Sequence, residues 1–415
     1  MARTVHIIGA GMAGLAAAVR LARAGAKVVV HEAANHAGGR CRSYHDPAID
    51  MVIDNGNHLV LSGNHATMGF LDAIGSRGGL HGPDRAEFSF VDLANDERWT
   101  LRLSEGRIPW WIFDESARVP GTRAPDYLPL ARLLSPPLRA TVGEVMACEG
   151  PLWNRFLAPL LLAALNTEPR LGSARLAAGV LRETITRGGR ACHPLIAHGL
   201  SAAFIDPALA YIGSRRGEVR LGRRLRAFAF DAERVTALDF GEETVPLAPG
   251  DAVILAVPPT VAVSLLPGLT APTEFNGIVN AHFAYRRPQA AAPAMLGAVG
   301  GLVEWLFVFP DRLSVTISGA NRLMDEERDG LARKIWYDVT RMLNMSEPLP
   351  PWQIVRERRA TFSATPAQDA LRPEARTRWP NLMLAGDWIA TGLPATIEGA
   401  VRSGNRAAQL VGERP

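Results

Sequence analysis

The stretch Thr4–Glu32, TVHIIGAGMAGLAAAVRLARAGAKVVVHE, decides how the chain is expected to fold. It contains a short β-branched strand at 4–8, a G-x-G-x-x-G loop, an Ala/Leu-rich helix at 13–24 and a second strand at 27–32. This order, ending in an acid, is typical of a dinucleotide-binding βαβ unit. The alternative is a buried strand–helix–strand unit without a ligand, and the two strands together with the acid make it the weaker interpretation.

Each glycine of the loop has a mechanical reason. Gly9 permits the tight turn, Gly11 lets the backbone approach a pyrophosphate, and Gly14 lets the helix pack close to the strand. The N-terminus of the helix then presents free N–H groups and a partial positive charge to the phosphates. Glu32 is placed to accept hydrogen bonds from a ribose.

The composition describes an ordinary globular protein of 415 residues, with 47% hydrophobic and 21% charged residues. This length suits two or three domain-sized units. The net charge of +4 is spread along the chain without a Lys/Arg block, so no nucleic-acid partner is expected. Three widely spaced cysteines form neither a disulfide framework nor a metal cluster, so we expect no metal site and a reducing, cytoplasmic location.

A second glycine cluster follows the second strand. Gly38 and Gly39 allow backbone to crowd a ligand, and Arg40 can neutralise a diphosphate. The alternative is an ordinary glycine turn with a solvated arginine. The motif Asp54-Asn55-Gly56-Asn57-His58 comes shortly afterwards.

Residues 102–189 differ in character from their surroundings. They are rich in Leu, Trp and Pro and predict a mainly helical insertion, with apolar helices at 153–165 and 174–186. Such an insertion is either plain core, or a cap that lines a lipid-sized cavity or contacts a membrane surface peripherally, at its inner face. No transmembrane helix is expected, because prolines interrupt the charge-free stretch 252–273.

The later part of the chain returns to strands. Residues 219–257 predict several, the last of them a buried strand that stops at Pro258. Strands at 278–285, 303–309 and 313–318 suggest a second, antiparallel sheet, and 326–345 an amphipathic helix. A further strand is expected at 356–362.

The C-terminal end carries the second informative cluster. The strand 381–385 ends in Gly386-Asp387, and residues 391–401 open a helix that continues to about Leu410. A strand that ends in Gly-Asp beside a helix N-terminus suits a ribityl chain and phosphate. A dinucleotide held from both ends of the chain is more typical of a flavin than of a nicotinamide. The dinucleotide domain is therefore expected to be discontinuous.

Together these motifs resemble the flavin amine oxidase and phytoene desaturase superfamily. Within it, the chain resembles the hydroxysqualene dehydroxylase family of bacterial hopanoid pathways. The resemblance rests on Asp54–His58, on the segments 162–167 and 359–366, and on 386–400. Relatives often have Gln where Asn57 stands, a change that keeps the hydrogen-bonding chemistry. Amine oxidases usually carry an aromatic residue before Glu-Gly-Ala of the last helix, where this chain has Ala395-Thr396-Ile397.

The resemblance implies an FAD enzyme that converts the isoprenoid hydroxysqualene to squalene, by hydride transfer from reduced flavin to an allylic cation. Non-covalent FAD is expected, because no cysteine follows Cys192. The alternatives are a carotenoid-type isoprenoid desaturase, a flavin amine oxidase, and a non-enzymatic prenyl-binding escort. The electron donor and the oligomeric state stay open. His58 is the candidate for the acid that protonates the leaving hydroxyl, with a packing histidine as the alternative.

The expected fold is therefore α/β, with a Rossmann-like FAD-binding domain of the flavin amine oxidase type and a discontinuous, mixed α+β substrate-binding domain. The expected FAD-binding parts are 1–75, 211–270 and 356–415, and the substrate parts are a mainly helical 76–210 and a sheet-and-helix 271–355. The residues expected to bind the cofactor are Gly9, Gly11, Met12, Ala13, Gly14, Glu32, Ala33, Gly38, Gly39, Arg40, Asn55, Gly56, Asn57, Leu225, Gly386, Asp387, Thr396 and Ile397.

Overall fold

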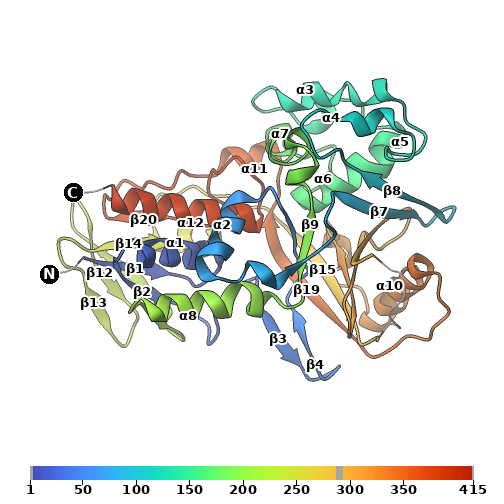
Figure 1. The fold of residues 1–415 in the computed structure, drawn as a ribbon. Coiled ribbons are helices and arrows are strands. Elements are labelled where there is room, and N and C mark those ends of the chain that lie inside the picture. Colours follow the sequence, from blue (N-terminus) through green and yellow to red (C-terminus); the bar gives the residue numbers. More distant parts are fainter. Residues whose placement is uncertain (1–2, 287–292, 414–415) are drawn as a thin grey trace.

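The computed structural model describes residues 3–286 and 293–413. A parallel sheet with its helices forms one end of the molecule, while a larger sheet and a group of short helices form the other (Figure 1). Both chain termini lie at the end that contains the parallel sheet.

The parallel sheet has the strand order β10-β2-β1-β14-β20, and every neighbouring pair is parallel. Its interior strands are runs of Val, Ile and Leu, as expected for strands buried on both faces. The strands come from three separate parts of the chain, so the sheet is discontinuous. Their bounds are β1 Thr4–Ile8, β2 Lys27–His31, β10 Glu218–Arg220, β14 Ala252–Leu255 and β20 Leu382–Leu384.

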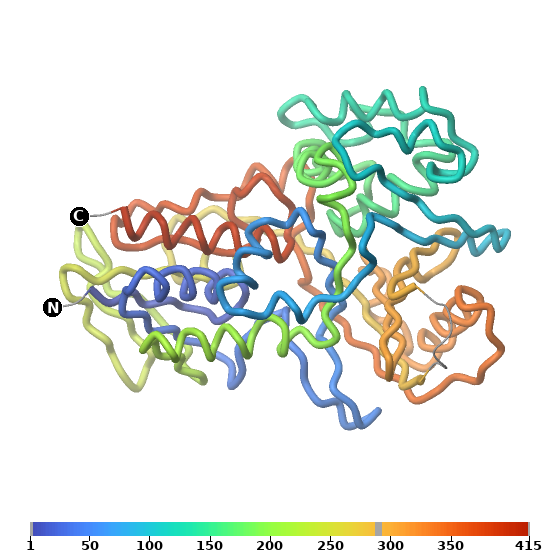
Figure 2. Tube along the Cα trace, in the orientation of Figure 1, coloured from blue at the N-terminus to red at the C-terminus, as the bar shows by residue number. Residues whose placement is uncertain are grey.

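Helices from both ends of the chain cover this sheet. Helix α12 (Ile397–Gly412) runs alongside α1 (Met12–Arg23), and the blue and red tubes in Figure 2 lie next to each other. A Cβ placed on Gly404 would lie 2.1 Å from the carbonyl oxygen of Ala13, so the two helices touch backbone to backbone. Helices α2 (His65–Ile74) and α8 (Asp206–Ser214) pack beside them.

A small antiparallel sheet packs into the same hydrophobic core as the parallel sheet. The turn 240–243 leads into a short strand that the sequence did not predict, β13. The bounds are β11 Ala227–Phe230, β12 Val235–Asp239 and β13 Thr244–Pro246.

The second large sheet has seven strands in the order β19-β15-β18-β17-β16-β7-β8. Helix α10 (Arg328–Leu343) packs on one face and shares a separate core with it. The strands predicted at 278–285, 303–309 and 313–318 pair antiparallel, as expected. The sheet as a whole is mixed, because β7, which the sequence did not predict, pairs in parallel with β16. These two strands come from distant segments, so no hairpin fixes their direction. The bounds are β7 Glu87–Asp92, β8 Glu97–Arg102, β15 Phe275–Phe283, β16 Met295–Val299, β17 Trp305–Val308, β18 Leu313–Ile317 and β19 Trp352–Phe362.

The insertion is helical, as predicted, but its helices are short. Its predicted apolar helix at 153–165 begins with π-helical turns, η4 (Trp153–Leu157), and continues as α6 (Ala158–Leu165). The segment 76–210, expected to be mainly helical, also contributes the hairpin β7–β8 to the large sheet. The other elements of the insertion are η2 Trp110–Phe113, η3 Ala124–Tyr127, α3 Leu130–Leu134, α4 Val142–Val145, α5 Gly150–Leu152, α7 Ala174–Glu183, η5 Ile185–Arg187 and η6 Gly189–Ala191.

Short elements connect these parts. Helix α12 begins at Ile397, later than the segment 391–401 suggested. The connecting elements are β3 Ser43–Asp46, β4 Met51–Asp54, β5 Leu59–Leu61, η1 Arg77–Gly79, β6 Leu80–His81, β9 Pro194–Ala197, η7 Ser201–Ile205, α9 Pro259–Leu265, η8 Ala320–Leu323 and α11 Pro366–Ala370.

Candidate active site

The glycine loop between β1 and α1 lies at the carboxyl edge of the parallel sheet. Gly9 has a φ of +107°, and a Cβ placed on it would lie 2.4 Å from the carbonyl oxygen of Ala256. A Cβ on Gly14 would lie 1.9 Å from the carbonyl oxygen of Gly9. Only glycine fits at either position, because real Cβ atoms do not approach so closely.

Gly11 is different, because space lies next to it. A Cβ on Gly11 would have no atom of the described residues within 4 Å. Gly38 forms a parallel bridge with Gly11, and its N–H donates to the carbonyl of Ala10 at 2.8 Å. A Cβ on Gly39 would lie 3.4 Å from the Cα of Gly11. The two glycine loops therefore lie against each other, with open space beside Gly11.

Glu32 follows β2 at the same edge of the sheet. Its Oε2 accepts the N–H of Ala10 at 2.7 Å, and its Oε1 accepts the N–H of Ala34 at 2.9 Å. These bonds fix the carboxylate next to the glycine loop. The main-chain carbonyl of Glu32 accepts the N–H of Arg223, which brings the neighbourhood of the buried Leu225 to this end of the site.

The C-terminal cluster meets the N-terminal one at an ion pair. A guanidinium nitrogen of Arg40 lies 2.7 Å from a carboxylate oxygen of Asp387, and Arg40 also donates to the carbonyl of Ala360. Gly386 has a φ of +150°, and its N–H donates to Ser403 Oγ at 2.8 Å. The two ends of the chain thus come together at Arg40 and Asp387.

Two helix N-termini point to the same edge. Thr396 caps α12 by accepting the N–H of Gly399 at 3.0 Å, directly before Ile397. Helix α1 has no side-chain cap among the described residues, so the first-turn N–H groups at Met12 and Ala13 are left for a ligand.

These residues fit an adenine dinucleotide. A diphosphate requires space close to the main chain, free N–H groups and a cation, which are present beside Gly11, at the uncapped start of α1 and at Arg40. A ribose requires a hydrogen-bond acceptor, which Glu32 provides. All of them lie at the carboxyl edge of a parallel sheet, near the change of strand order between β1 and β14. The part of the dinucleotide beyond the diphosphate would then extend towards the large sheet.

The segment Asn55–His58 joins this edge to the large sheet. Asn57 Nδ2 donates to the carbonyl of Val315 at 3.2 Å and to Thr316 Oγ1 at 3.1 Å. A Cβ on Gly56 would lie 3.2 Å from Nδ2 of Asn280. The buried Oδ1 of Asn57 has no hydrogen-bond partner among the described residues, so an acceptor is available here to a bound donor.

The face of the large sheet away from α10 changes from polar to aromatic across its strands. Residues directly opposite one another in a sheet point to the same face. One row starts at Asn280, which accepts the hydroxyl of Thr316 at 2.8 Å, and ends at Trp99 on β8. Phe90 stacks on Trp99 at 5.4 Å between ring centroids and meets Trp305 edge-on at 5.5 Å. The full row is Asn280, Thr316, Trp305, Gly297, Phe90 and Trp99.

His58 lies at the polar end, deep in the molecule but partly accessible. The pKa of His58 is lowered to about 4, mainly by burial and also by the charge of Arg40, while a hydrogen bond to the Arg40 backbone opposes both effects. A histidine with this pKa is neutral at pH 7 and a poor proton donor. The catalytic role of His58 therefore stays a prediction, and the pKa weakens it.

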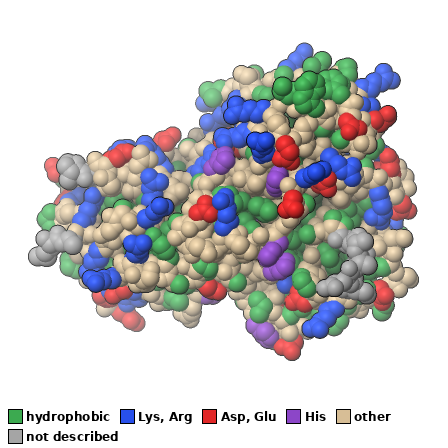
Figure 3. Space-filling view, viewed as in Figure 1, with side chains coloured by type: hydrophobic (Ala, Val, Ile, Leu, Met, Phe, Trp, Pro, Cys, Tyr) green, Lys and Arg blue, Asp and Glu red, His purple; other side chains and the backbone are tan. Residues whose placement is uncertain are grey.

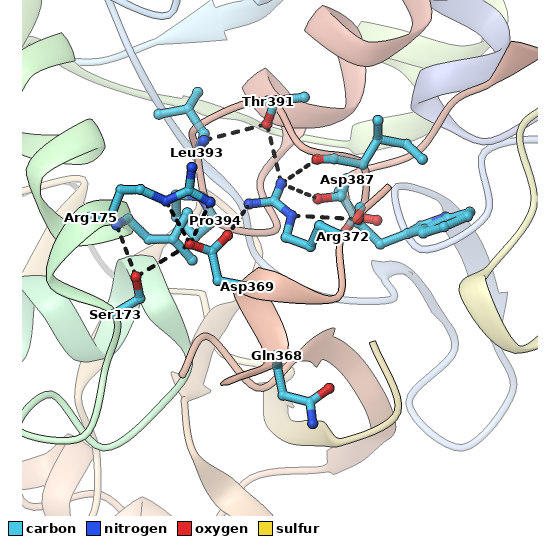
Figure 4. Close-up of polar contacts among 12 residues, drawn as sticks. Ser173, Arg175, Gln368, Asp369, Arg372, Asp387, Thr391, Leu393 and Pro394 are labelled. Atoms are coloured by element: carbon cyan, nitrogen blue, oxygen red, sulfur yellow. Dashed lines mark hydrogen bonds and ion pairs between the residues drawn. The ribbon is translucent and has the colours of Figure 1, made fainter. Parts of the chain in front are cut away.

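A buried polar cluster that the sequence did not indicate supports the C-terminal loop (Figure 4). The Arg372 side chain is 0% exposed and lies 3.1 Å from Oδ1 of Asp369. It also donates to main-chain carbonyls of the 387–389 segment. Burial lowers the pKa of Arg372, and the charge of Asp369 opposes this. Arg372 is one of many arginines in the chain, and no spacing distinguishes it.

The fold and this site define a class of protein. Residues 12–412 match the sequence model of one protein family, the flavin containing amine oxidoreductases. Cyclohexylamine oxidase from Brevibacterium oxydans shares the fold, with a TM-score of 0.72 and 17% identity over 100% of this chain and 99% of that one.

Relatives with higher sequence identity belong to one family within this class. The chain is 58% identical over 413 residues to hydroxysqualene dehydroxylase of Rhodopseudomonas palustris, covering 99% of both proteins. It is 55% identical over 411 residues to hydroxysqualene dehydroxylase of Sinorhizobium fredii, covering 99% of this chain and 98% of the relative. The chain therefore belongs to the hydroxysqualene dehydroxylase family, within the flavin containing amine oxidoreductases.

Proposed function

We propose that this protein is an FAD-dependent oxidoreductase that replaces the hydroxyl of hydroxysqualene by hydrogen and so forms squalene. The substrate is taken from the names of the relatives. One observation on this chain supports it most: the row that passes from Asn280 and Thr316 beside Asn57 to the aromatic rings of Trp305 and Phe90. A long hydrocarbon with one hydroxyl matches a surface that is polar at one end and aromatic at the other.

The reaction needs a hydride and a proton, and its products are squalene and water. Reduced FAD, when bound, supplies the hydride. The residues expected to hold FAD are those of the two glycine loops, Glu32, Arg40 and the segment after Gly386. Asn57 would orient the substrate hydroxyl through its free carbonyl oxygen.

Trp305, which lies directly opposite Thr316, and the rings beyond it would keep bulk water away from the reacting carbon. Loss of water from an allylic alcohol leaves a resonance-stabilised cation, which water recaptures unless it is excluded. The rings of Phe90 and Trp305 are buried and form one cluster with Phe307. His58, at the polar end, is the candidate donor for the proton that leaves with the hydroxyl.

The function is tested without oxygen. Enzyme reduced by light is mixed with hydroxysqualene while the flavin spectrum is followed and the product is extracted. The proposal requires the flavin to be reoxidised, with one squalene formed for each flavin. If substrate instead bleaches the oxidised enzyme, the protein is a desaturase and the proposal is wrong.

We also propose that the insertion contacts the membrane from which such a substrate would come. Its outer surface carries apolar side chains that are more than half exposed, among them Trp110, Phe113 and Leu138. Figure 3 shows hydrophobic side chains gathered at the top of the molecule, where the insertion lies, with basic side chains around them. Exposed Arg107, Arg132 and others match an anionic lipid surface. No helix among the described residues is long and apolar enough to cross a bilayer.

Sedimentation with vesicles of phosphatidylglycerol tests this contact. The double variant Trp110→Ala/Phe113→Ala should bind the vesicles at least about tenfold more weakly than wild type, since each ring buries a large apolar area. The control is Tyr337→Ala, which removes an aromatic residue that is 62% exposed on α10, outside the insertion. Wild-type protein that stays in the supernatant, or equal loss in the control, would contradict the proposal.

A further inference from the structure

The buried side chain of Arg372 donates hydrogen bonds to four acceptors in a single loop. From the segment after α11, it donates to the carbonyl oxygens of Asp387 at 3.2 Å, Trp388 at 3.4 Å and Ile389, and to Thr391 Oγ1 at 3.3 Å. Each of these acceptors belongs to the loop that follows β20. A planar guanidinium carries five donors on three nitrogens in a rigid fork, whereas a lysine carries three donors on one nitrogen and so reaches fewer, less widely spaced acceptors.

Asp369 holds this guanidinium in place and is itself held from the other side. Its Oδ1 lies 3.1 Å from Arg372, and its Oδ2 accepts from Arg175 at 2.7 Å and 2.9 Å. The Asp369 side chain is 4% exposed, and its charge is matched by two cations. A buried carboxylate with partners on both sides fixes the relative positions of those partners.

Arg175 belongs to helix α7 of the insertion, which lies along the same loop. A Cβ placed on Gly179 would be 2.3 Å from the carbonyl oxygen of Gly392, so helix and loop are in backbone contact. At the end of the helix, Glu183 pairs with Arg402 of α12 at 3.0 Å. Figure 4 shows Ser173 and Arg175 pointing to Asp369 from one side and Arg372 from the other.

The loop so held contains the C-terminal half of the cofactor site. Asp387 is bound to Arg372 through its carbonyl and to Arg40 through its carboxylate, at 2.7 Å. A shift of this loop would therefore move both the Asp387 carboxylate, which pairs with Arg40, and the start of α12. We propose that Arg372 is a positioning residue that sets the loop from Gly386 to Thr391 for FAD, and that Arg175 ties this setting to the insertion through Asp369. The proposal rests on the FAD dependence given above.

The experiment measures FAD binding directly. Apo-protein is titrated with FAD, and the flavin spectrum and the melting temperatures of apo- and holo-protein are recorded for each variant. Arg372→Lys should raise the Kd of FAD at least about tenfold, because lost hydrogen bonds to a charged donor have effects of this order. It should also shift the flavin spectrum and reduce the gain in melting temperature on adding FAD. Asp369→Asn should give the same changes more weakly. Arg175→Gln should raise the Kd of FAD only about threefold, since the Arg175 side chain is 44% exposed.

The matched control is Arg376→Lys, at an exposed arginine four residues along that pairs with Glu413. It should leave FAD affinity and spectrum unchanged. The proposal is overturned if Arg372→Lys lowers the melting temperatures of apo- and holo-protein equally while the Kd and the spectrum stay the same. If Arg372→Lys does not fold, Asp369→Asn and Arg175→Gln decide, and behaviour like the control overturns it. Wild-type enzyme that does not convert hydroxysqualene would refute the proposed function while leaving these FAD measurements interpretable.

Discussion

The cofactor site at the five-stranded sheet and the proposed substrate site at the seven-stranded sheet differ in which part of the chain forms them. The five-stranded sheet uses main chain at its carboxyl edge, where Gly9 and Gly14 are needed because any side chain would strike a carbonyl oxygen. The seven-stranded sheet uses side chains on one face, from Asn280 to Trp99, and the residues of this row lie on six different strands.

This difference follows from the chemistry that each site must handle. A diphosphate is bound by backbone N–H groups at a helix start, which requires close approach and small residues. A hydrocarbon is bound by area and shape, which large side chains supply and which many sequences can provide. We therefore expect a glycine-to-alanine substitution at the five-stranded sheet to weaken FAD binding, and one in the seven-stranded sheet to weaken substrate binding.

Gly14→Ala should have the largest effect. Its Cβ would lie 1.9 Å from the Gly9 carbonyl oxygen, so α1 must move away from β1. We expect the Kd of FAD to rise at least about 100-fold, or no holo-protein to form. The control is Gly69→Ala in α2, where the new Cβ meets no atom of the described residues within 4 Å. Normal FAD binding by Gly14→Ala would contradict the close packing of this loop.

Glu32→Ala should weaken FAD binding by about ten- to a hundred-fold, because a charged hydrogen-bond acceptor is removed. The carboxylate also holds the N–H groups of Ala10 and Ala34, so part of the loss comes from the loop itself. Glu32→Gln, which keeps one acceptor oxygen, should lie between wild type and Glu32→Ala. Unchanged FAD occupancy in folded Glu32→Ala protein would show that Glu32 does not face the cofactor.

Gly297→Ala tests the other sheet with the same chemical change. A Cβ on Gly297 would lie 2.5 Å from the ring of Phe90 and 3.1 Å from that of Trp305, so both rings must shift. We expect the Kd of hydroxysqualene to rise about tenfold, because the displaced rings would no longer match the substrate. The same overpacking should lower the stability of the protein by about 1–3 kcal/mol. FAD affinity should not change. A loss of FAD with retained substrate binding would mean that the aromatic end does not serve the substrate.

His58→Asn should have the smallest effect at pH 7. The pKa of His58 is lowered to about 4, so the side chain is already neutral there, and we expect single-turnover rates within about threefold of wild type. An acid must be protonated to act, so a donor role predicts that the wild-type rate rises as the pH falls towards 4. His58→Asn would lose that rise. A loss of about 100-fold or more at pH 7 would instead identify His58 as the working acid, with a pKa raised by bound ligands.

The sequence predicted the parallel sheet well because its signals are local. The strand 4–8, the glycine loop and the helix that follows lie in one continuous stretch, and the structure has β1 at Thr4–Ile8 and α1 at Met12–Arg23. The strand predicted at 381–385 is present as β20, Leu382–Leu384, though α12 begins only at Ile397. The assignment of individual residues to the cofactor stays a prediction that the substitutions above test.

The large sheet was predicted less completely, because its pairing is not local. The strands 278–285 and 313–318 were expected, but the hairpin β7–β8 and its parallel pairing with β16 were not. No pattern in residues 87–102 indicates that β7 pairs with β16, which lies more than two hundred residues further along the chain. The polar-to-aromatic row depends on the register of six strands, which the sequence did not predict.

The sequence by itself determined the dinucleotide edge, because backbone contact with a phosphate permits only glycine at fixed spacings, and such spacings can be read along the chain. Only the tertiary structure decided which side chains support that edge. Arg372 reaches the carbonyl oxygens of the 387–389 loop, and Asp369 connects it to Arg175, through contacts set by how α7, α11 and the loop pack together. A guanidinium can meet carbonyl oxygens from many positions in a sequence, so the fold alone selects which arginine does so.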